Sequence, residues 1–113
     1  MKIGRLENVA KEAVAAEGSR GASIQWLLSK RDGVPHFYMR LVTVEPGGII
    51  PLHQHEVIHE MYILKGKGAV LRPDGEIPIG ENDFVYMPSG EIHGTKNTGT
   101  EPLQFICCID AEK

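Results

Sequence analysis

The stretch Gly47–Gly66, GGIIPLHQHEVIHEMYILKG, contains three of the chain's five histidines, His53, His55 and His59. His53 and His55 are two residues apart, so on an extended backbone both imidazoles point to the same face. A fourth histidine, His93, comes later in the stretch PSGEIHGTKN. Neutral imidazole is a good ligand for divalent transition metals. The four histidines therefore predict a metal site, provided that the fold brings them together.

The composition is that of an ordinary globular domain. The chain has 113 residues, of which 42% are hydrophobic and 24% charged, and one core accounts for this length. The net charge is −3, and no basic stripe suggests a nucleic-acid partner. No apolar run is long enough to span a membrane or to resemble a signal peptide. We expect residues 1–113 to form one cytoplasmic domain with neither a nucleic-acid nor a membrane partner.

The two cysteines, Cys107 and Cys108, are neighbours in the sequence. Adjacent side chains on a strand point to opposite faces, so these two thiols are poorly placed to form a disulfide with each other. Free thiols fit a reducing compartment.

The first 20 or so residues allow two interpretations. Apolar side chains fall at helical spacing in this segment, while Gly18 and Gly21 and the shortness of the apolar stripe argue against a helix. The residues at helical spacing are Leu6, Val9, Ala10, Ala13 and Val14. We predict an N-terminal arm over residues 1–20, extended and packed on a partner chain.

From Ser23 onward, short apolar runs alternate with turn signals. Glu45–Gly48 ends one run with Pro and two Gly, and Pro73–Gly75 has the residues of a tight turn. This pattern of short apolar runs and turns predicts an all-β sandwich, jelly roll or barrel. The predicted strands cover residues 24–28, 37–44, 60–64, 69–72, 76–79, 84–87, 92–96 and 103–109.

The histidine stretch resembles the first signature of the cupin superfamily. That signature is Gly, five residues, His-x-His, three or four residues, Glu, six residues, Gly. Gly47, His53 and His55 match it in spacing. Counting back six residues from Gly66 reaches His59, so a histidine takes the position where most cupins have a glutamate ligand.

A later stretch resembles the second cupin signature, which is Gly, five residues, Pro-x-Gly, two residues, His, three residues, Asn. Pro88, Gly90, His93 and Asn97 match in spacing. Asn82 occupies the leading glycine position, which Asn tolerates if the backbone there is left-handed.

The chain is most similar to small single-domain cupins that hold manganese through four histidines. The shared runs are R-L-x-T-V-E-P-G-G at 40–48, H-x-H-x-x-x-H-E at 53–60 and P-x-x-E-I-H-G at 88–94. The resemblance implies a double-stranded β-helix (jelly-roll) barrel with its core at 40–109, and a homodimer. It also implies one divalent metal per chain, manganese first, with Fe, Ni, Cu, Co and Zn as alternatives. The implied metal ligands are His53, His55, His59 and His93.

Strand parity suggests further pocket residues. If His93 faces the metal, so does Thr95. On the last strand either Phe105, Cys107 and Ile109 face inward, or Ile106 and Cys108 do, and the resemblance favours the first set. Arg40 could hold an anionic substrate, although an outward ion-pair role is the commoner one for such a residue. The candidate pocket residues are Arg40, Thr95, Phe105 and Cys107.

Glu60, next to His59, has three possible roles: it could orient a ligand, lie on the surface, or bind the metal itself. We favour the first two. A shell of four neutral imidazoles leaves the full divalent charge on the site, which favours an anionic ligand. His36 lies outside both signatures, and we expect it on the surface.

Three functions fit this site. The first is a mononuclear metalloenzyme that activates a small organic substrate by dioxygenase-like or other oxidative chemistry. The second is metal-assisted isomerisation or epimerisation of a sugar or keto acid, which needs a general base such as Glu60. The third is a non-catalytic module that binds or senses a small molecule. The fold hosts all three, so it does not choose among them.

Overall fold

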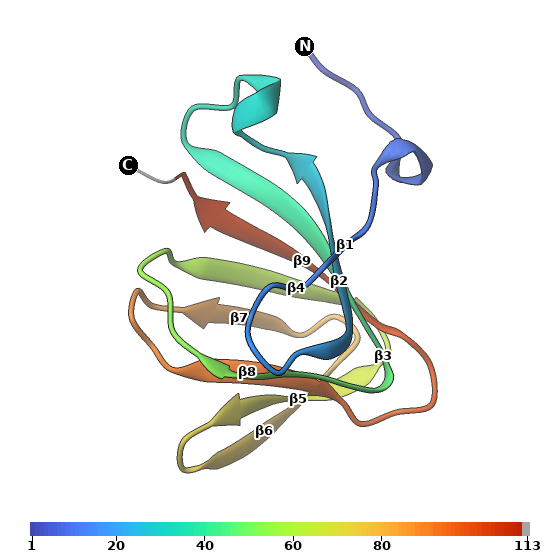
Figure 1. Cartoon of the computed structure of the whole chain (residues 1–113), viewed down its shortest axis with the longest axis vertical. Coiled ribbons are helices and arrows are strands. Elements are labelled where there is room, and N and C mark those ends of the chain that lie inside the picture. The colour runs from blue at the N-terminus through green and yellow to red at the C-terminus, as the bar shows by residue number, and fades with distance from the viewer. Residues whose placement is uncertain (112–113) are drawn as a thin grey trace.

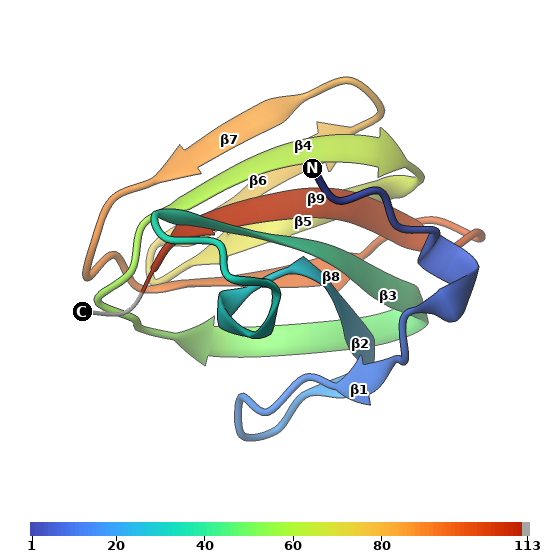
Figure 2. The ribbon, with the colours of Figure 1, turned by 90° about the horizontal axis from the view of Figure 1, so that it is seen from above.

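The computed structural model describes residues 1–111, which form a strongly curled antiparallel β-sheet (Figures 1 and 2). The predicted all-β fold is confirmed. Within this range the only helices are two short 3₁₀ turns, and neither could cross a membrane. The elements in chain order are η1 (Leu6–Asn8), β1 (Glu12–Ala13), β2 (Arg20–Leu28), η2 (Lys30–Asp32), β3 (Phe37–His53), β4 (His59–Lys65), β5 (Lys67–Arg72), β6 (Gly75–Gly80), β7 (Phe84–Met87), β8 (His93–Asn97) and β9 (Leu103–Asp110).

The long strand β3 joins the two halves of the barrel. Its first part, residues 37–44, pairs with β9, and its last part, from Ile49 to His53, pairs with β8. The strand order is β6-β5-β8-β3-β9-β4-β7, and β2 pairs with β3 as well. Because one strand belongs to both halves, the sheet curls around a single interior (Figure 2).

The prediction that a strand ends at Glu45–Gly48 was wrong, because β3 continues through this segment. The backbone bends there instead of turning back. Gly47 has a φ of +80°, and a Cβ on Gly48 would lie 2.8 Å from the Gly21 carbonyl oxygen. The cross-strand pairs run up to Val44 and resume at Ile49, so Pro46 lies between them and its missing N–H removes no ladder bond.

The core lies inside the curl and is built from alternate residues of the strands. On β4 and β9 buried and more exposed residues alternate along much of the strand. Cys107 is buried and Cys108 is half-buried, and neither forms a disulfide. The two thiols therefore lie on opposite faces, as their adjacency predicts. The buried core cluster is Val42, Val44, Ile50, Met61, Ile63, Val70, Ile79, Met87, Leu103, Phe105, Cys107 and Ile109.

The N-terminal segment is an arm tied to the barrel, with only one 3₁₀ turn and the two-residue strand β1. The Gln25 side-chain amide donates hydrogen bonds to the carbonyl oxygens of Leu6 (3.3 Å) and Val9 (3.0 Å). β2 begins at Arg20, four residues before the predicted start, because Arg20 pairs with Ile49 across an irregularity at Gly21. Packing against a partner chain stays a prediction.

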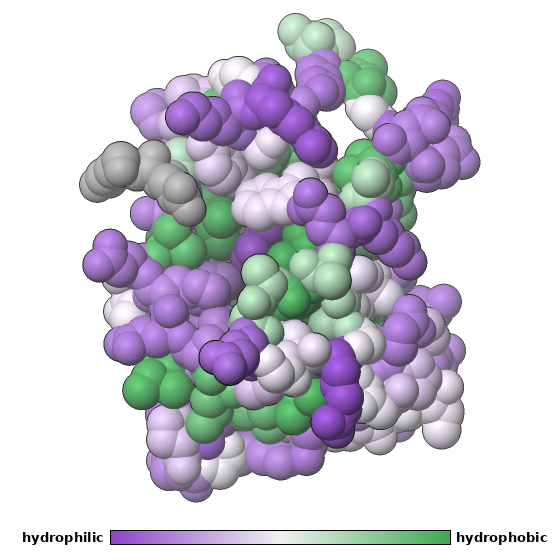
Figure 3. Space-filling view, in the orientation of Figure 1, coloured by the Kyte–Doolittle hydropathy of each residue, from purple (hydrophilic) through white to green (hydrophobic). Residues whose placement is uncertain are grey.

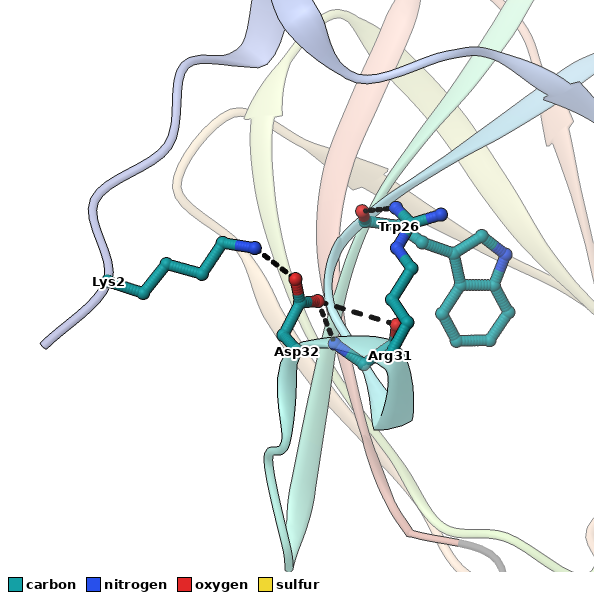
Figure 4. Close-up of polar contacts among 5 residues, drawn as sticks. Lys2, Trp26, Arg31 and Asp32 are labelled. Carbon is teal, nitrogen blue, oxygen red and sulfur yellow. Dashed lines mark hydrogen bonds and ion pairs between the residues drawn. The ribbon is translucent and has the colours of Figure 1, made fainter.

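A second anchor holds the beginning of the arm (Figure 4). Lys2 forms an ion pair with Asp32 at the end of η2. The Asp32 carboxylate also accepts a hydrogen bond from the Ser29 backbone N–H (2.9 Å), which closes a capping box around this turn. Arg31 donates to the Trp26 carbonyl oxygen at 2.8 Å. These contacts join the arm, η2 and the end of β2.

Asn82, the residue in the glycine position of the second signature, has a φ of +69°. Its backbone N–H donates to the Ile63 carbonyl oxygen (2.9 Å), and its side chain accepts a hydrogen bond from the Tyr62 hydroxyl (3.0 Å). The backbone at Asn82 is therefore left-handed, which is the condition under which Asn can take the glycine position of the signature.

Candidate metal centre

The four histidines come together at one end of the barrel. His53 is the last residue of β3 and His93 the first of β8, and the two lie opposite each other in the β3–β8 register. His59 is the first residue of β4, and His55 lies in the loop between β3 and β4. A Cβ on Gly94 would lie 2.5 Å from the Ile50 carbonyl oxygen. This glycine therefore lets β8 approach β3 closely beside the His53–His93 pair.

The loop that carries His55 is held from two sides. The Gly90 N–H donates to the His55 carbonyl oxygen (2.8 Å), and the Gln54 side chain donates to the Gly90 carbonyl oxygen (2.6 Å). Further along, the Ile58 N–H donates to a carboxylate oxygen of Asp110 at 2.9 Å. The stretch with the first signature is thus bonded directly to the Pro88–Gly90 turn of the second.

Three of the imidazoles form a tight group. The ligand atoms of His53, His55 and His93 all lie within 4.8 Å of one another. His59 adjoins this group without being part of it. Its ring centroid is 4.8 Å from that of His55 and 5.2 Å from that of His93. The geometry offers three convergent donors and a fourth beside them.

Hydrogen bonds orient two of the rings. His53 Nδ1 lies 2.7 Å from the Pro51 carbonyl oxygen, and His93 Nδ1 lies 2.9 Å from that of Glu91. A carbonyl oxygen only accepts, so in each ring Nδ1 carries the proton and donates it. The Nε2 lone pair of each ring is then free to bind a metal.

His59 has different neighbours. Its Nδ1 lies 3.2 Å from Cys107 Sγ and 3.3 Å from Arg40 Nη2, and Arg40 Nη2 donates to the same sulfur at 2.9 Å. A guanidinium has no acceptor. Of these two neighbours only Cys107 Sγ can accept a hydrogen bond from a protonated His59 Nδ1, and with the proton on Nδ1 the His59 Nε2 lone pair is free.

Three of the histidines, His55, His59 and His93, are in surroundings that favour the neutral imidazole. Burial, helped by the neighbouring Arg40 charge, lowers the pKa of His59 to about 3. Burial and the adjacent His53 lower the pKa of His55 to about 4. Burial also lowers the pKa of His93, although its bond to the Glu91 carbonyl opposes this. Neutral imidazole is the form that binds metals.

The site fits a divalent metal ion. His59 Nε2 is buried and has no hydrogen-bond partner among residues 1–111. A buried nitrogen without a partner is costly, and a metal ion beside it would remove that cost. The donors are neutral nitrogens, which suit Mn, Fe, Co, Ni, Cu and Zn more than Mg or Ca.

The histidines line one end of a cavity of about 390 Å³ inside the barrel. All four candidate pocket residues, Arg40, Thr95, Phe105 and Cys107, line this cavity as well. Phe105 and Cys107 lie on the buried face of β9. Burial raises the pKa of the Cys107 thiol, against the opposing effect of Arg40.

Arg40 is a cation without a counter-ion in this cavity. No carboxylate forms an ion pair with it among the described residues, and its Nε is buried without a hydrogen-bond partner. Its guanidinium stacks on the Trp26 ring at 5.4 Å from the centroid and donates to Cys107 Sγ. The arginine is therefore held beside the histidines with part of its hydrogen-bonding capacity unused.

Glu60 lies outside the cavity. It is exposed, and in the sheet it is opposite Tyr86 of β7 and Cys108 of β9, on the outer face. Its carboxylate raises the pKa of the Cys108 thiol, after the larger effect of burial. His36 is exposed too. Of the adjacent pair His59 and Glu60, the histidine is therefore the one placed at the site.

The sequence did not indicate two parts of the cavity wall. Trp26 is opposite Arg40 in the β2–β3 register, a pairing that a single strand pattern does not predict. Residues Val14, Ala15 and Ala16 come from the N-terminal segment and also line the cavity. No motif marks them, because their position depends on how the arm folds back over the barrel.

The fold and the site define a small β-barrel protein with a histidine cluster that could bind a metal. The chain belongs to the cupin family, since residues 40–109 match the model of the Cupin domain. It is 38% identical over 65 residues to the oxalate-binding protein of Thermotoga maritima, an alignment that covers 57% of this chain and 54% of that protein. The chain thus spans about half the length of this relative.

Two solved structures agree with this assignment. The polyketide cyclase RemF from Streptomyces resistomycificus superimposes with a TM-score of 0.92 at 28% identity, over 99% of this chain and 80% of that one. A predicted oxalate decarboxylase from Thermotoga maritima gives a TM-score of 0.84 at 27% identity, over 98% of this chain and 100% of that one. The predicted jelly-roll barrel of cupin type is confirmed.

Proposed function

We propose that this protein binds one divalent transition metal and, at that metal, a small organic anion, which it activates for oxidative chemistry. His53, His55 and His93 are the proposed ligands, with His59 Nε2 as the fourth. Manganese is the expected metal, on the resemblance to four-histidine cupins. When bound, such a metal supplies Lewis-acid chemistry and, if it is Mn, Fe or Cu, redox chemistry.

The main support for an anionic ligand is the position of Arg40 in the cavity. Arg40 is half-buried, its buried Nε has no hydrogen-bond partner, and no carboxylate pairs with its charge among the described residues, so an incoming anion would offset the cost of holding that charge in the cavity. The four neutral histidines contribute no negative charge, so the metal would keep its full charge in the same cavity. The name of the Thermotoga relative, an oxalate-binding protein, supports a carboxylate as the anionic group.

The residues have distinct proposed roles. Arg40 pairs with the anion, and Trp26 holds the guanidinium in place. Cys107 Sγ accepts a hydrogen bond from His59 Nδ1–H and so keeps the His59 Nε2 lone pair available to the metal. The apolar remainder of the cavity excludes water, which strengthens the electrostatic interactions inside it.

Binding of oxalate to the manganese-loaded protein tests the proposal. We expect one manganese per chain by elemental analysis and saturable oxalate binding by calorimetry. Arg40→Gln should weaken oxalate binding by about 30-fold or more while manganese is retained. Oxalate affinity that is unchanged in Arg40→Gln, or no uptake of any of the six candidate metals, would contradict the proposal.

Oxygen consumption separates the three functions. Oxidative chemistry requires dioxygen or peroxide with Mn, Fe or Cu and stops with Zn, whereas an isomerase works without oxygen and with Zn. A binding module shows only a ligand-dependent rise in Tm. No Asp or Glu lines the cavity within residues 1–111, and Glu60 faces outward, so the isomerase lacks the carboxylate base that it would need.

The proposed homodimer has a candidate surface on the outer face of β4 and β7. Tyr62 lies opposite Phe84 in the register, and Tyr62, Phe84 and Tyr86 are 44%, 81% and 60% exposed. With part of their surface already covered, these three aromatic side chains can bury roughly 400 Å², about half of the about 800 Å² per partner of a stable interface. A second copy, placing the same face against this one, is the occupant that we propose.

The molar mass in solution tests this surface. We expect a dimer for the unaltered chain and a monomer for Phe84→Glu by sedimentation velocity. Ile77→Glu, on β6 and 48% exposed, is the matched control and should remain a dimer. A monomeric unaltered chain, or a dimeric Phe84→Glu variant, would contradict the proposal.

A further inference from the structure

The cavity is polar at one end and apolar along its walls. Its polar side chains are those of the four histidines and Arg40, which lie together where the metal and the anion are proposed to bind, and that of Thr95, two residues from His93 on β8. Cys107 contacts Arg40 and His59 in this polar group. The rest of the lining is Val14, Ala15, Ala16, Ile24, Trp26, Val42, Ile50, Val57, Met61, Phe105 and Ile109. A ligand that consists only of two carboxylates would contact the polar end and leave these walls unused.

The volume of the cavity points to a larger ligand. About 390 Å³ falls in the range of pockets that hold organic molecules of cofactor or drug size. Apolar space of this kind favours an apolar group over water. The cavity therefore has room for an anionic head at the metal and an apolar body beside it.

Val14, Ala15 and Ala16 of the N-terminal segment form part of the cavity wall, called the Val14–Ala16 wall below. Figure 1 shows the β1–β2 connection running across the front of the barrel, and Figure 3 shows hydrophobic residues in the middle of that same face. Val14 and Ala16 pack against the core. The Val14 N–H donates to the Ala22 carbonyl oxygen (3.1 Å), and the Ser19 N–H donates to that of Ala16 (3.1 Å).

This wall is closely fitted and made of small side chains. At Gly18, which has a φ of +82°, a Cβ would lie 3.3 Å from Pro51 Cγ, so the connection approaches β3 closely. Ala16 is half-buried against the core, whereas Ala15 is exposed, and each side chain is a single methyl group. A longer side chain at Ala16 would occupy the space that the small residues leave open.

We infer that the ligand of this site is an organic acid with a carboxylate head and an apolar body about the size of an aromatic ring. The head binds at the metal and Arg40. The body lies between Trp26 on β2 and the Val14–Ala16 wall, and Ala16 limits its size. This inference rests on the proposed function, because it places the ligand's head at the proposed metal.

Two 2-oxo acids with the same head and different bodies test the inference. Pyruvate carries a methyl group and phenylglyoxylate a phenyl ring on the same carbonyl. We expect the manganese-loaded protein to bind phenylglyoxylate at least about ten-fold more tightly than pyruvate, because the ring adds several buried carbons. Ala16→Phe should remove this preference and leave the affinity for oxalate and the manganese content unchanged.

Two further variants exclude a general effect of altering the arm. Ala13→Phe makes the same change at an exposed residue of β1 outside the cavity lining and should keep the preference. Val14→Ala shortens the wall without adding bulk and should weaken binding of phenylglyoxylate several-fold, with pyruvate unaffected.

The outcomes separate this inference from the proposed function. Oxalate binding with equal affinities for pyruvate and phenylglyoxylate would overturn the inference and leave the proposed function standing. A preference for phenylglyoxylate that persists in Ala16→Phe would overturn the assignment of the ring to this wall. If the metal-loaded protein binds none of the three acids, the proposed function fails and the inference fails with it.

Discussion

The inner and outer faces of β4 differ sharply although they alternate along one strand. Inward lie His59 at the candidate metal centre and then Met61 and Ile63, which are 5% and 0% exposed. Outward lie Glu60, Tyr62 and Leu64, all exposed. Both faces carry large hydrophobic or aromatic side chains in the sequence, because Tyr62 and Leu64 alternate with Met61 and Ile63. Position relative to the curl of the sheet, and not residue type, determines which side chains form the site and the core.

The largest expected difference between the faces is in stability. Ile63→Ala creates a cavity in the core and should lower the free energy of unfolding by about 2–5 kcal/mol. Leu64→Ala, its neighbour at 48% exposed, should cost less than about 1 kcal/mol. Urea denaturation of both metal-free variants at one protein concentration measures this. Similar losses in the two variants would show that the outer face is as closely packed as the inner one.

Metal affinity should distinguish His59 from Glu60, the first inward and the first outward residue of β4. His59→Ala removes a proposed ligand and should weaken metal binding by more than about 100-fold, since even the loss of a residue that orients a ligand costs 10–100-fold. Glu60→Ala should leave metal affinity unchanged. Competition with a chelator of known affinity measures both variants. Equal losses, or a loss in Glu60→Ala alone, would refute the four-histidine site.

The two cysteines on β9 also lie on the inner and the outer face of the sheet, and we expect a smaller difference in metal affinity between their variants. Cys107→Ala removes the acceptor of the His59 Nδ1 proton and should weaken metal binding by about ten-fold. Cys108→Ala, on the outer face, should have no effect. Cys107→Ser keeps an acceptor at the position and should recover much of the affinity. The same chelator competition reports all three, and a Cys107→Ala variant with unaltered affinity would remove Cys107 from the site.

Much of the fold could be predicted because its signals are local. Apolar runs broken by Gly and Pro indicated short strands, and the resemblance of the two histidine stretches to the cupin signatures implied a cupin barrel. The left-handed backbone of Asn82 follows from the same spacing. The prediction for Glu45–Gly48 failed because Pro and Gly mark a change of direction equally well in a turn and in a bent strand. Only the partners β9 and β8, distant in sequence, show that β3 continues.

The sequence by itself determined the histidine spacing, and with it the candidate ligands and the chemistry open to them. The tertiary structure decided that His59 and not Glu60 faces the cavity, and that Arg40 has no counter-ion there. It also decided that Trp26, Cys107 and the Val14–Ala16 wall surround the site. The physical reason is that these relations depend on cross-strand register and on the path of the arm. Both are set by contacts between segments far apart in the chain, which no local pattern encodes.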